Sequence, residues 1–275
     1  MGSAGHLRAL CAGSSDRRVI LFPGVLGNLT GYSNVVTSLK ASCELYGLRY
    51  ASNIRNGDRN ALQALAEQCA EHILELPDAR PTHLLGWSLG GLMARECGAV
   101  LSSRGRAPVT IVMVDPARRS TAEQTPSPGE PMLGRAERQE LLWRRFLNLK
   151  CDAEGVRRVL AHHDFFALSE SERFKLVQVH QKRWSTEVLP PVGLRTSFRL
   201  MCTTHDALKS YVPSPCPGAL YAICSDRYWT SESPHWHEDA SDSTCVIRVR
   251  GDHLTAILHF AIPAIVEIVS GAAIH

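Results

Sequence analysis

Residues 82–96 read "THLLGWSLGGLMARE", and this stretch decides the fold. It begins with a short apolar run typical of a buried strand, and from Leu89 its apolar spacing is that of a helix. The Gly-x-Ser-x-Gly pattern centred on Ser88 lies between the two. In a strand, turn and helix context, the small flanking residues allow a sharp turn that lifts the serine hydroxyl above the sheet. We therefore predict that Ser88 is a nucleophile, and the alternative is a tight turn without chemistry.

Short apolar runs alternate with helical patterns along the chain, which predicts parallel strands joined by crossover helices in a doubly wound sheet. We expect strands at 18–22, 43–50, 82–86, 109–114, 219–224 and 245–249, and helices at 29–40, 60–76, 89–103 and 254–269. In the helix at 60–76, Asn60 is the predicted N-cap and Pro77 ends the helix, and the helix at 254–269 is largely apolar.

This alternation is interrupted after the fourth strand. Residues 120–131 are mainly Ser, Thr, Pro, Glu and Gly, which is typical of a loop, and the pattern from 135 to about 211 is helical. We predict a single domain over residues 1–275, with a helical lid at about 120–210 inserted into a core at about 17–119 and 211–270. We expect the lid histidines His162, His163 and His180 to lie on solvated helix faces, and substrate contact is the alternative.

Composition excludes several classes of protein. The chain of 275 residues is 44% hydrophobic, which is enough for a large core, and its net charge of +3 is dispersed, so we expect no nucleic-acid or membrane partner. No signal-peptide pattern and no run of 18 apolar residues are present, and we expect a cytoplasmic monomer. The nine cysteines lack a CxxC spacing, so we expect reduced thiols, no metal and no bound cofactor. The cluster His235, His237, Glu238 and Asp239 favours a solvated loop over a metal site.

A serine nucleophile needs a base to take its proton and an acid to orient that base. Asp115 ends the strand "VTIVMVD" that directly follows the helix after Ser88. His253 lies in "VIRVRGDHLTAIL", where the last strand ends, a glycine turns the chain and the last helix begins. The order Ser, Asp, His fits an α/β-hydrolase sheet. We predict Ser88, Asp115 and His253 as a catalytic triad.

Two other acids compete for the role of Asp115. Asp226 follows the strand "ALYAIC", where many α/β-hydrolases place their acid, and it is the alternative. Asp252 adjoins His253 and cannot easily turn back onto its ring, so we interpret it as structural.

Acyl chemistry also needs hydrogen-bond donors for the developing oxyanion. One should be the backbone N–H of Leu89, the residue after the nucleophile, and the other should come from the loop after the first core strand. That loop reads "LFPGVLGN", and Val25 is our choice within it.

Four motifs, "ILFPGVLGN", "GWSLGG", "IVMVDPARR" and "VRGDHLTAIL", resemble those of the thioesterase domains that terminate nonribosomal peptide synthetases and related polyketide synthases. The resemblance spans roughly residues 17–116 and 211–270, and "DALKSYVPSPCPGALYAI" is similar to the return of that family from its lid. It implies that the acid follows the strand after the nucleophile helix, which favours Asp115. It also implies that Ser88 takes a peptidyl or acyl chain from the phosphopantetheine thioester of an upstream carrier protein. His253 would then activate water or an internal nucleophile, giving hydrolysis or cyclisation.

Other functions stay open at this point. Free-standing editing (type II) thioesterases share the catalytic layout but usually carry "GHS" where this chain has Trp87 and Ser88, and a carboxylesterase has the same fold. A noncatalytic binding module would have no need to keep serine, acid and histidine in order.

Overall fold

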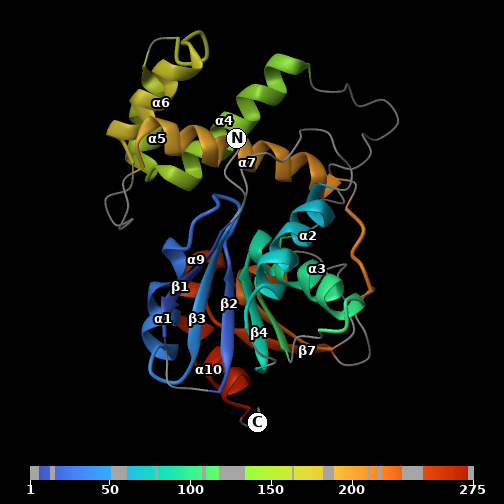
Figure 1. The fold of residues 1–275 in the computed structure, drawn as a ribbon. Coiled ribbons are helices and arrows are strands. Elements are labelled where there is room, and N and C mark those ends of the chain that lie inside the picture. Colours follow the sequence, from blue (N-terminus) through green and yellow to red (C-terminus); the bar gives the residue numbers. More distant parts are fainter. Residues whose placement is uncertain are drawn as a thin grey trace.

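The computed structural model describes residues 6–12, 16–50, 61–77, 80–106, 110–117, 134–162, 164–181, 189–209, 211–215, 218–230 and 244–271. Asn60, the 120–131 loop, His163 and the 235–239 cluster, all discussed above, lie outside these ranges. The described residues form a sheet with helices on both faces and a group of helices stacked on one end (Figure 1). This is the predicted α/β arrangement.

Among the described residues the sheet has seven strands, in the order β1-β3-β2-β4-β5-β6-β7. All pairs are parallel except β1 with β3, which is antiparallel and shifts register between Ala9 and Cys11. Strand β1 was not predicted, because an edge strand of six mixed residues is held by its partner rather than by a strong apolar pattern. The strands are β1 (His6–Cys11), β2 (Arg18–Phe22), β3 (Glu44–Arg49), β4 (Thr82–Trp87), β5 (Thr110–Val114), β6 (Ala219–Ser225) and β7 (Thr244–Val249).

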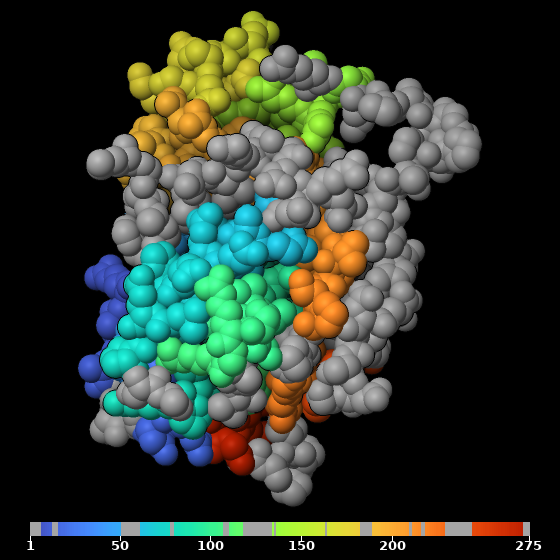
Figure 2. Space-filling model, turned by 45° about the vertical axis from the view of Figure 1, so that its right-hand side comes forward, coloured from blue at the N-terminus to red at the C-terminus, as the bar shows by residue number. Residues whose placement is uncertain are grey.

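Alternation along the strands divides the core into two layers. In β2, Ile20 and Phe22 pack against α2 (Ala61–Leu74) and α3 (Leu89–Ser103), whereas Val19 and Leu21 face the opposite side. That side is covered by α1 (Ser33–Leu39) and α10 (Ile262–Ser270). Figure 2 shows α2 and α3 beside each other on their face, in cyan and green, beneath the helices at the top. A short 3₁₀ helix, Thr30–Tyr32, precedes α1. Burial on both faces explains why every residue of β2 and β5 is buried.

The C-terminal helix differs from the single helix predicted over 254–269. It comprises α9 (His253–Thr255), a π-helical turn (Ala256–Phe260) and α10, with a bend of 55° before α10. Pro263 lies in the first turn of α10, where a missing N–H is tolerated. Its ring would clash with the preceding turn if the helix from His253 continued straight into α10. The Ala261 N–H bonds instead to the Ala256 carbonyl, as a π-turn requires. His253 lies at the carboxyl end of the sheet because α9 begins four residues after the end of β7.

In the part of the chain that the structure describes, four helices between β5 and β6 form what we call the helical insertion. They surround Trp143, which is fully buried and whose ring stacks on Phe198 at 4.2 Å between ring centroids. Phe146, Phe165 and Phe174 complete this aromatic cluster. The helices are α4 (Arg135–Lys150), α5 (Ala153–Ala161), α6 (Glu170–Val179) and α7 (Pro191–Lys209).

Helix α7 belongs to both parts of the molecule. Its first half, with Phe198, packs in the aromatic cluster, and Ala207 near its end packs in the core beside α2 and α3. The chain after α7 is anchored by the buried carboxylate of Glu96 on α3. That carboxylate accepts hydrogen bonds from the Tyr211 hydroxyl (2.5 Å) and from the Ser214 N–H and hydroxyl (2.9 and 2.6 Å). The insertion is therefore fixed to the core at its C-terminal end.

Two further expectations concern helix length and cysteines. Within the described residues no single helix is both long and apolar enough to cross a membrane. The segments His253–Phe260 and Ile262–Ser270 reach that length and composition only as a bent pair. The eight cysteines that the structure describes are free thiols.

Candidate active site

Ser88 occupies a sharp turn between β4 and α3. Its φ of 57° and ψ of −124° are strained for a residue with a side chain. The flanking glycines are required by close backbone approach: a Cβ on Gly86 would lie 1.9 Å from the Gly90 carbonyl oxygen, and one on Gly90 would lie 2.2 Å from the Phe22 oxygen. Glycine at positions 86 and 90 therefore allows α3 to pack closely against β2 and β4, while Ser88 between them projects from the end of the sheet.

The backbone of Ser88 is held on both sides. Its N–H donates to the Val114 carbonyl (3.0 Å), and its carbonyl accepts from the N–H groups of Gly91 (3.0 Å) and Ala117 (2.9 Å). These bonds tie the turn to the end of β5, the strand that Asp115 follows.

Asp115 is fully buried and faces His253. The Ser225 N–H and hydroxyl donate to its two carboxylate oxygens, both at 2.7 Å, and Oδ2 lies 3.4 Å from Nδ1 of His253. This distance is long for a hydrogen bond, and such contacts commonly tighten when substrate binds. Sequence reasoning missed Ser225, because only the pairing of β5 with β6 brings it to Asp115.

His253 is held through its backbone and its ring. The indole N–H of Trp87 donates to the His253 carbonyl (2.8 Å), and the two rings lie 4.9 Å apart between centroids. The His253 side chain remains about half exposed. Trp87, the residue before Ser88, therefore fixes the loop that carries the histidine, a role with no signal in the sequence.

The two other acids make contacts of their own. Asp252 caps α9 by accepting from the N–H groups of Leu254 (3.1 Å) and Thr255 (2.9 Å). Hydrogen bonds from the backbone and then the hydroxyl of Thr255 are the main reasons why the pKa of the Asp252 carboxyl lies below its ordinary value. Asp226 pairs with Arg248 at 3.0 Å, and both side chains are about half exposed. Neither contact directs the carboxylate at His253.

The loop after β2 is held by two buried tyrosines. The Tyr32 hydroxyl donates to the Phe22 carbonyl (2.7 Å) and accepts from the Trp87 N–H (2.6 Å), and the Tyr50 hydroxyl donates to the Pro23 carbonyl (2.6 Å). Burial raises the pKa of the Tyr32 phenol well above its ordinary value, so it stays protonated as a donor. Val25 follows directly in this loop.

Leu89 is the first residue of α3, so its N–H belongs to the helix start, where N–H groups have no partner within the helix. Strand β2 lies next to β4, so the loop with Val25 and the turn with Ser88 are neighbours. In parallel sheets, the crevice at the carboxyl ends where the chain changes direction is the common binding site.

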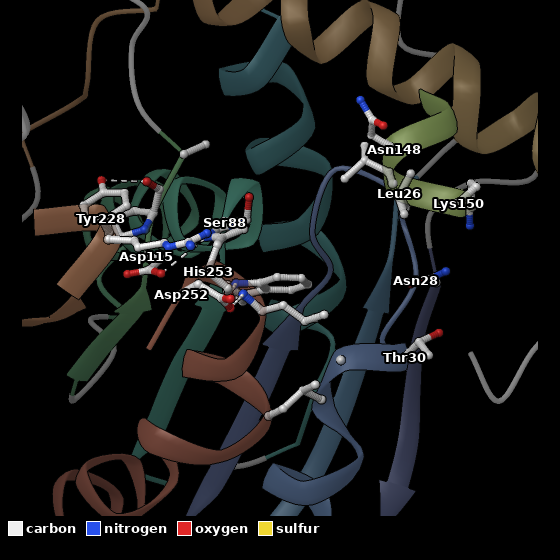
Figure 3. A pocket seen from close by; sticks show the side chains of 18 of the residues that line it. Leu26, Asn28, Thr30, Ser88, Asp115, Asn148, Lys150, Tyr228, Asp252 and His253 are labelled. Atoms are coloured by element: carbon white, nitrogen blue, oxygen red, sulfur yellow. Dashed lines mark hydrogen bonds and ion pairs between the residues drawn. The ribbon is translucent and has the colours of Figure 1, made fainter. Parts of the chain in front are cut away.

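Ser88, Asp115 and His253 line a cavity of about 860 Å³ between the sheet and the helical insertion, next to Leu26 of the loop after β2. Figure 3 shows Ser88, Asp115 and His253 grouped on one side, with Leu26, Asn148 and Lys150 on the other. The cavity thus has a reactive side formed by the core and a mixed polar and apolar side formed by α4 and the loop after β2. His162 and His180 are the residues directly after α5 and α6, and they are not among the described residues that line the cavity.

Within the described ranges, no three His, Cys, Asp or Glu side chains gather closely enough to hold a metal ion.

A family model described as "Thioesterase domain" matches residues 17–272. The chain belongs to the thioesterase domain family. Membership implies hydrolase activity on thioesters, and the match spans the sheet and the helical insertion alike.

This thioesterase domain is similar in fold to several solved structures. The Vlm2 thioesterase domain matches with a TM-score of 0.60 and 16% identity over 98% of this chain and 97% of that one. The NocB thioesterase domain, in covalent complex with a fluorophosphonate nocardicin G analogue, matches with a TM-score of 0.62 and 16% identity over 97% and 100%. The four-domain nonribosomal peptide synthetase AB3403 matches with a TM-score of 0.69 and 20% identity. That match covers 98% of this chain and 20% of the synthetase.

Proposed function

We propose that this thioesterase domain releases a peptidyl or polyketide chain from the phosphopantetheine thioester of a carrier protein, through an acyl-Ser88 intermediate. The observation that carries the proposal is the strained turn that places Ser88 at the same cavity as His253, whose ring faces buried Asp115. A hydroxyl on such a turn beside an imidazole and a carboxylate is the arrangement that acyl transfer requires.

The reaction proceeds in two steps. The Ser88 oxygen attacks the thioester carbonyl while Nε2 of His253 takes the hydroxyl proton. The oxyanion accepts hydrogen bonds from the N–H groups of Leu89 and Val25. As the carbon–sulfur bond breaks, His253 returns the proton to the leaving thiolate. His253 then takes a proton from water or from a nucleophile of the acyl chain, which attacks the ester carbonyl. As the bond to the Ser88 oxygen breaks, His253 gives the proton to that oxygen and the free enzyme is restored.

Asp115 is the acid of this proposed triad. It orients Nδ1 of His253 and stabilises the imidazolium, and the bonds from Ser225 keep the buried carboxylate fixed for that task. The pairing of Asp226 with Arg248 at the surface supports Asp115 over Asp226.

We propose further that the whole chain acts as one domain in which the helical insertion is the lid, because Asn148 and Lys150 of α4 form a wall of the cavity. A volume of about 860 Å³ exceeds what a small acyl group fills and suits a peptidyl or polyketide chain. Similarity in fold to domains of peptide synthetases supports an upstream carrier protein as the partner.

The test is intact-protein mass spectrometry of wild type and Ser88→Ala after exposure to peptidyl and acyl pantetheine thioesters, with matched oxoesters alongside. We expect acylation by thioesters in the wild type and none in Ser88→Ala at an unchanged melting temperature. The mass of the released product distinguishes attack by water from cyclisation. Thioester turnover by Ser88→Ala would overturn the mechanism. Reaction with small oxoesters alone would favour a carboxylesterase, and preference for short aberrant acyl groups on carriers would favour an editing thioesterase.

A further inference from the structure

Helix α7 of the insertion is hydrogen-bonded to the loop that follows β2. The Ser197 hydroxyl donates to the backbone carbonyl of Leu26 at 3.0 Å, and Ser197 is 5% exposed. Leu26 and its neighbour Val25 also pack against the aromatic cluster of the insertion. The loop is therefore supported from the insertion as well as from the sheet.

The approach of α7 to this loop is close. Gly27 has a φ of +72°, and a Cβ there would lie 2.8 Å from Cδ2 of Leu200 on α7. The left-handed backbone favours glycine at this position. The side chain of Leu200 lies directly against the turn, so α7 packs on it.

Two hydrogen bonds connect Ser197 to the N–H of Val25. The Leu26 carbonyl and the Gly27 N–H belong to one planar peptide unit, and the Gly24 carbonyl and the Val25 N–H belong to another. Ser197 holds the first unit through the Leu26 carbonyl, and the first unit holds the second through the bond from Gly27 N–H to the Gly24 carbonyl (2.9 Å). Because each unit is rigid, fixing one carbonyl limits the direction in which the Val25 N–H points. Hydrogen bonds in such a chain also strengthen one another.

We propose that Ser197 is a positioning residue that orients the Val25 N–H toward the oxyanion, so that the oxyanion hole is complete only while α7 is docked on this loop. The inference rests on the proposed function, in which Val25 supplies one of two donors. It adds a role for the insertion: displacement of α7 would slow the chemical step itself, besides changing access to the cavity.

The same helix offers a matched control. Thr204 is 1% exposed, and its hydroxyl donates only within α7, to the carbonyls of Leu200 (2.8 Å) and Met201 (3.2 Å). Thr204→Ala therefore removes a buried hydroxyl from α7 without touching the loop. Ser197→Thr keeps the hydroxyl, and Ser197→Cys keeps a weaker donor at nearly the same volume.

The probe is a dialkyl fluorophosphate, whose reaction does not depend on knowing the natural acyl chain. The Ser88 oxygen bonds to phosphorus, fluoride leaves, the hydroxyl proton passes to His253, and the phosphoryl oxygen takes the place of the oxyanion. Intact-protein mass spectrometry over time gives the limiting rate kinact and the half-saturating concentration KI. We expect Ser197→Ala to lower kinact about 10-fold, less than the roughly 100- to 1,000-fold of a lost donor, with KI changed by less than about twofold.

The comparison between variants decides the matter. Thr204→Ala should lower the melting temperature at least as much as Ser197→Ala yet leave kinact near wild type, Ser197→Thr should restore most of the rate, and Ser197→Cys should fall between. Equal kinact values for Ser197→Ala and Thr204→Ala, or no rescue by Ser197→Thr, would overturn the positioning role. Labelling of Ser88→Ala at the wild-type rate would instead overturn the proposed function, so the two failures are distinguishable.

Discussion

A methyl group added to Gly90 tests the close approach of α3 to the loop after β2. A Cβ at this position would lie 2.2 Å from the Phe22 carbonyl oxygen and 2.9 Å from that of Pro23. The first distance is about 1 Å short of an ordinary van der Waals contact. Both atoms belong to the backbone, and both carbonyls accept hydrogen bonds from the buried hydroxyls of Tyr32 and Tyr50. Neither carbonyl can turn away without losing its partner.

Gly91 provides the control, since it is the next residue of the same helix. A Cβ there would lie 3.2 Å from the Cβ atoms of Met113 and Pro116, so its neighbours need to move only slightly. Both substitutions gain about 1 kcal/mol in helix propensity. For Gly91→Ala this gain offsets the tighter packing, and we expect a free energy of unfolding within about 1 kcal/mol of wild type. For Gly90→Ala the overpacking exceeds the gain, and we expect a loss of about 3 kcal/mol.

Urea unfolding of both variants, followed by circular dichroism, measures this difference as a shift of the midpoint at constant slope. Gly90→Ala should also react more slowly with acyl thioesters per folded molecule, because displacement of Phe22 and Pro23 moves the adjacent Val25. Coincident midpoints for the two variants would refute the argument from close approach.

Three other changes have definite expected results. Asp115→Asn should lower kcat for thioester hydrolysis by about 10⁴-fold while Asp226→Asn changes it little, and the reverse ranking in steady-state assays would assign the acid to Asp226. Burial, and then the charge of Arg17, lower the pKa of His83 from 6.5 to about 4, so protonation favours the unfolded chain. The contribution of neutral His83 to the free energy of unfolding should be fully present above pH 6.5, and that free energy should fall by up to about 3 kcal/mol toward pH 4. His83→Leu should remove this pH dependence from the urea midpoint. Equal pH profiles for wild type and His83→Leu would contradict the prediction. Glu96→Ala should lower the free energy of unfolding by about 3 kcal/mol because it leaves the donors of Tyr211 and Ser214 unpaired, whereas an unchanged urea midpoint would show that this anchor adds nothing.

Much of the sheet was predictable because its strands are buried on both faces. Strands such as β2 and β5 are continuous apolar runs between turn residues, and that signal is local. Strand β1 lacks it, since it is an edge strand that pairs with β3 alone and has no buried residue among Leu7–Cys11. The break in the C-terminal helix did have a signal in Pro263, but the apolar spacing on either side concealed it.

The candidate site divides in the same way. Ser88, Asp115 and His253 were found from strand ends and from the order of their types along the chain. Ser225 and Trp87, which hold the acid and the histidine loop, were not, because their roles depend on which strands lie side by side.

The loop from Phe22 to Gly27 is where the two parts of the molecule meet. The backbone of Gly90 on α3 lies close to its first carbonyl, and the Ser197 hydroxyl of α7 donates to the carbonyl of Leu26, so different helices contact the two ends of the loop. A donor placed between two such supports keeps its direction only while both are in place. In the proposed mechanism, a displacement of α7 therefore reaches the Val25 N–H through the hydrogen bond from Ser197 to the Leu26 carbonyl. The rate of acyl transfer should then fall with substitutions in α7 that move the Ser197 hydroxyl away from the Leu26 carbonyl, including those that never touch the substrate, and not with those such as Thr204→Ala that leave this contact in place.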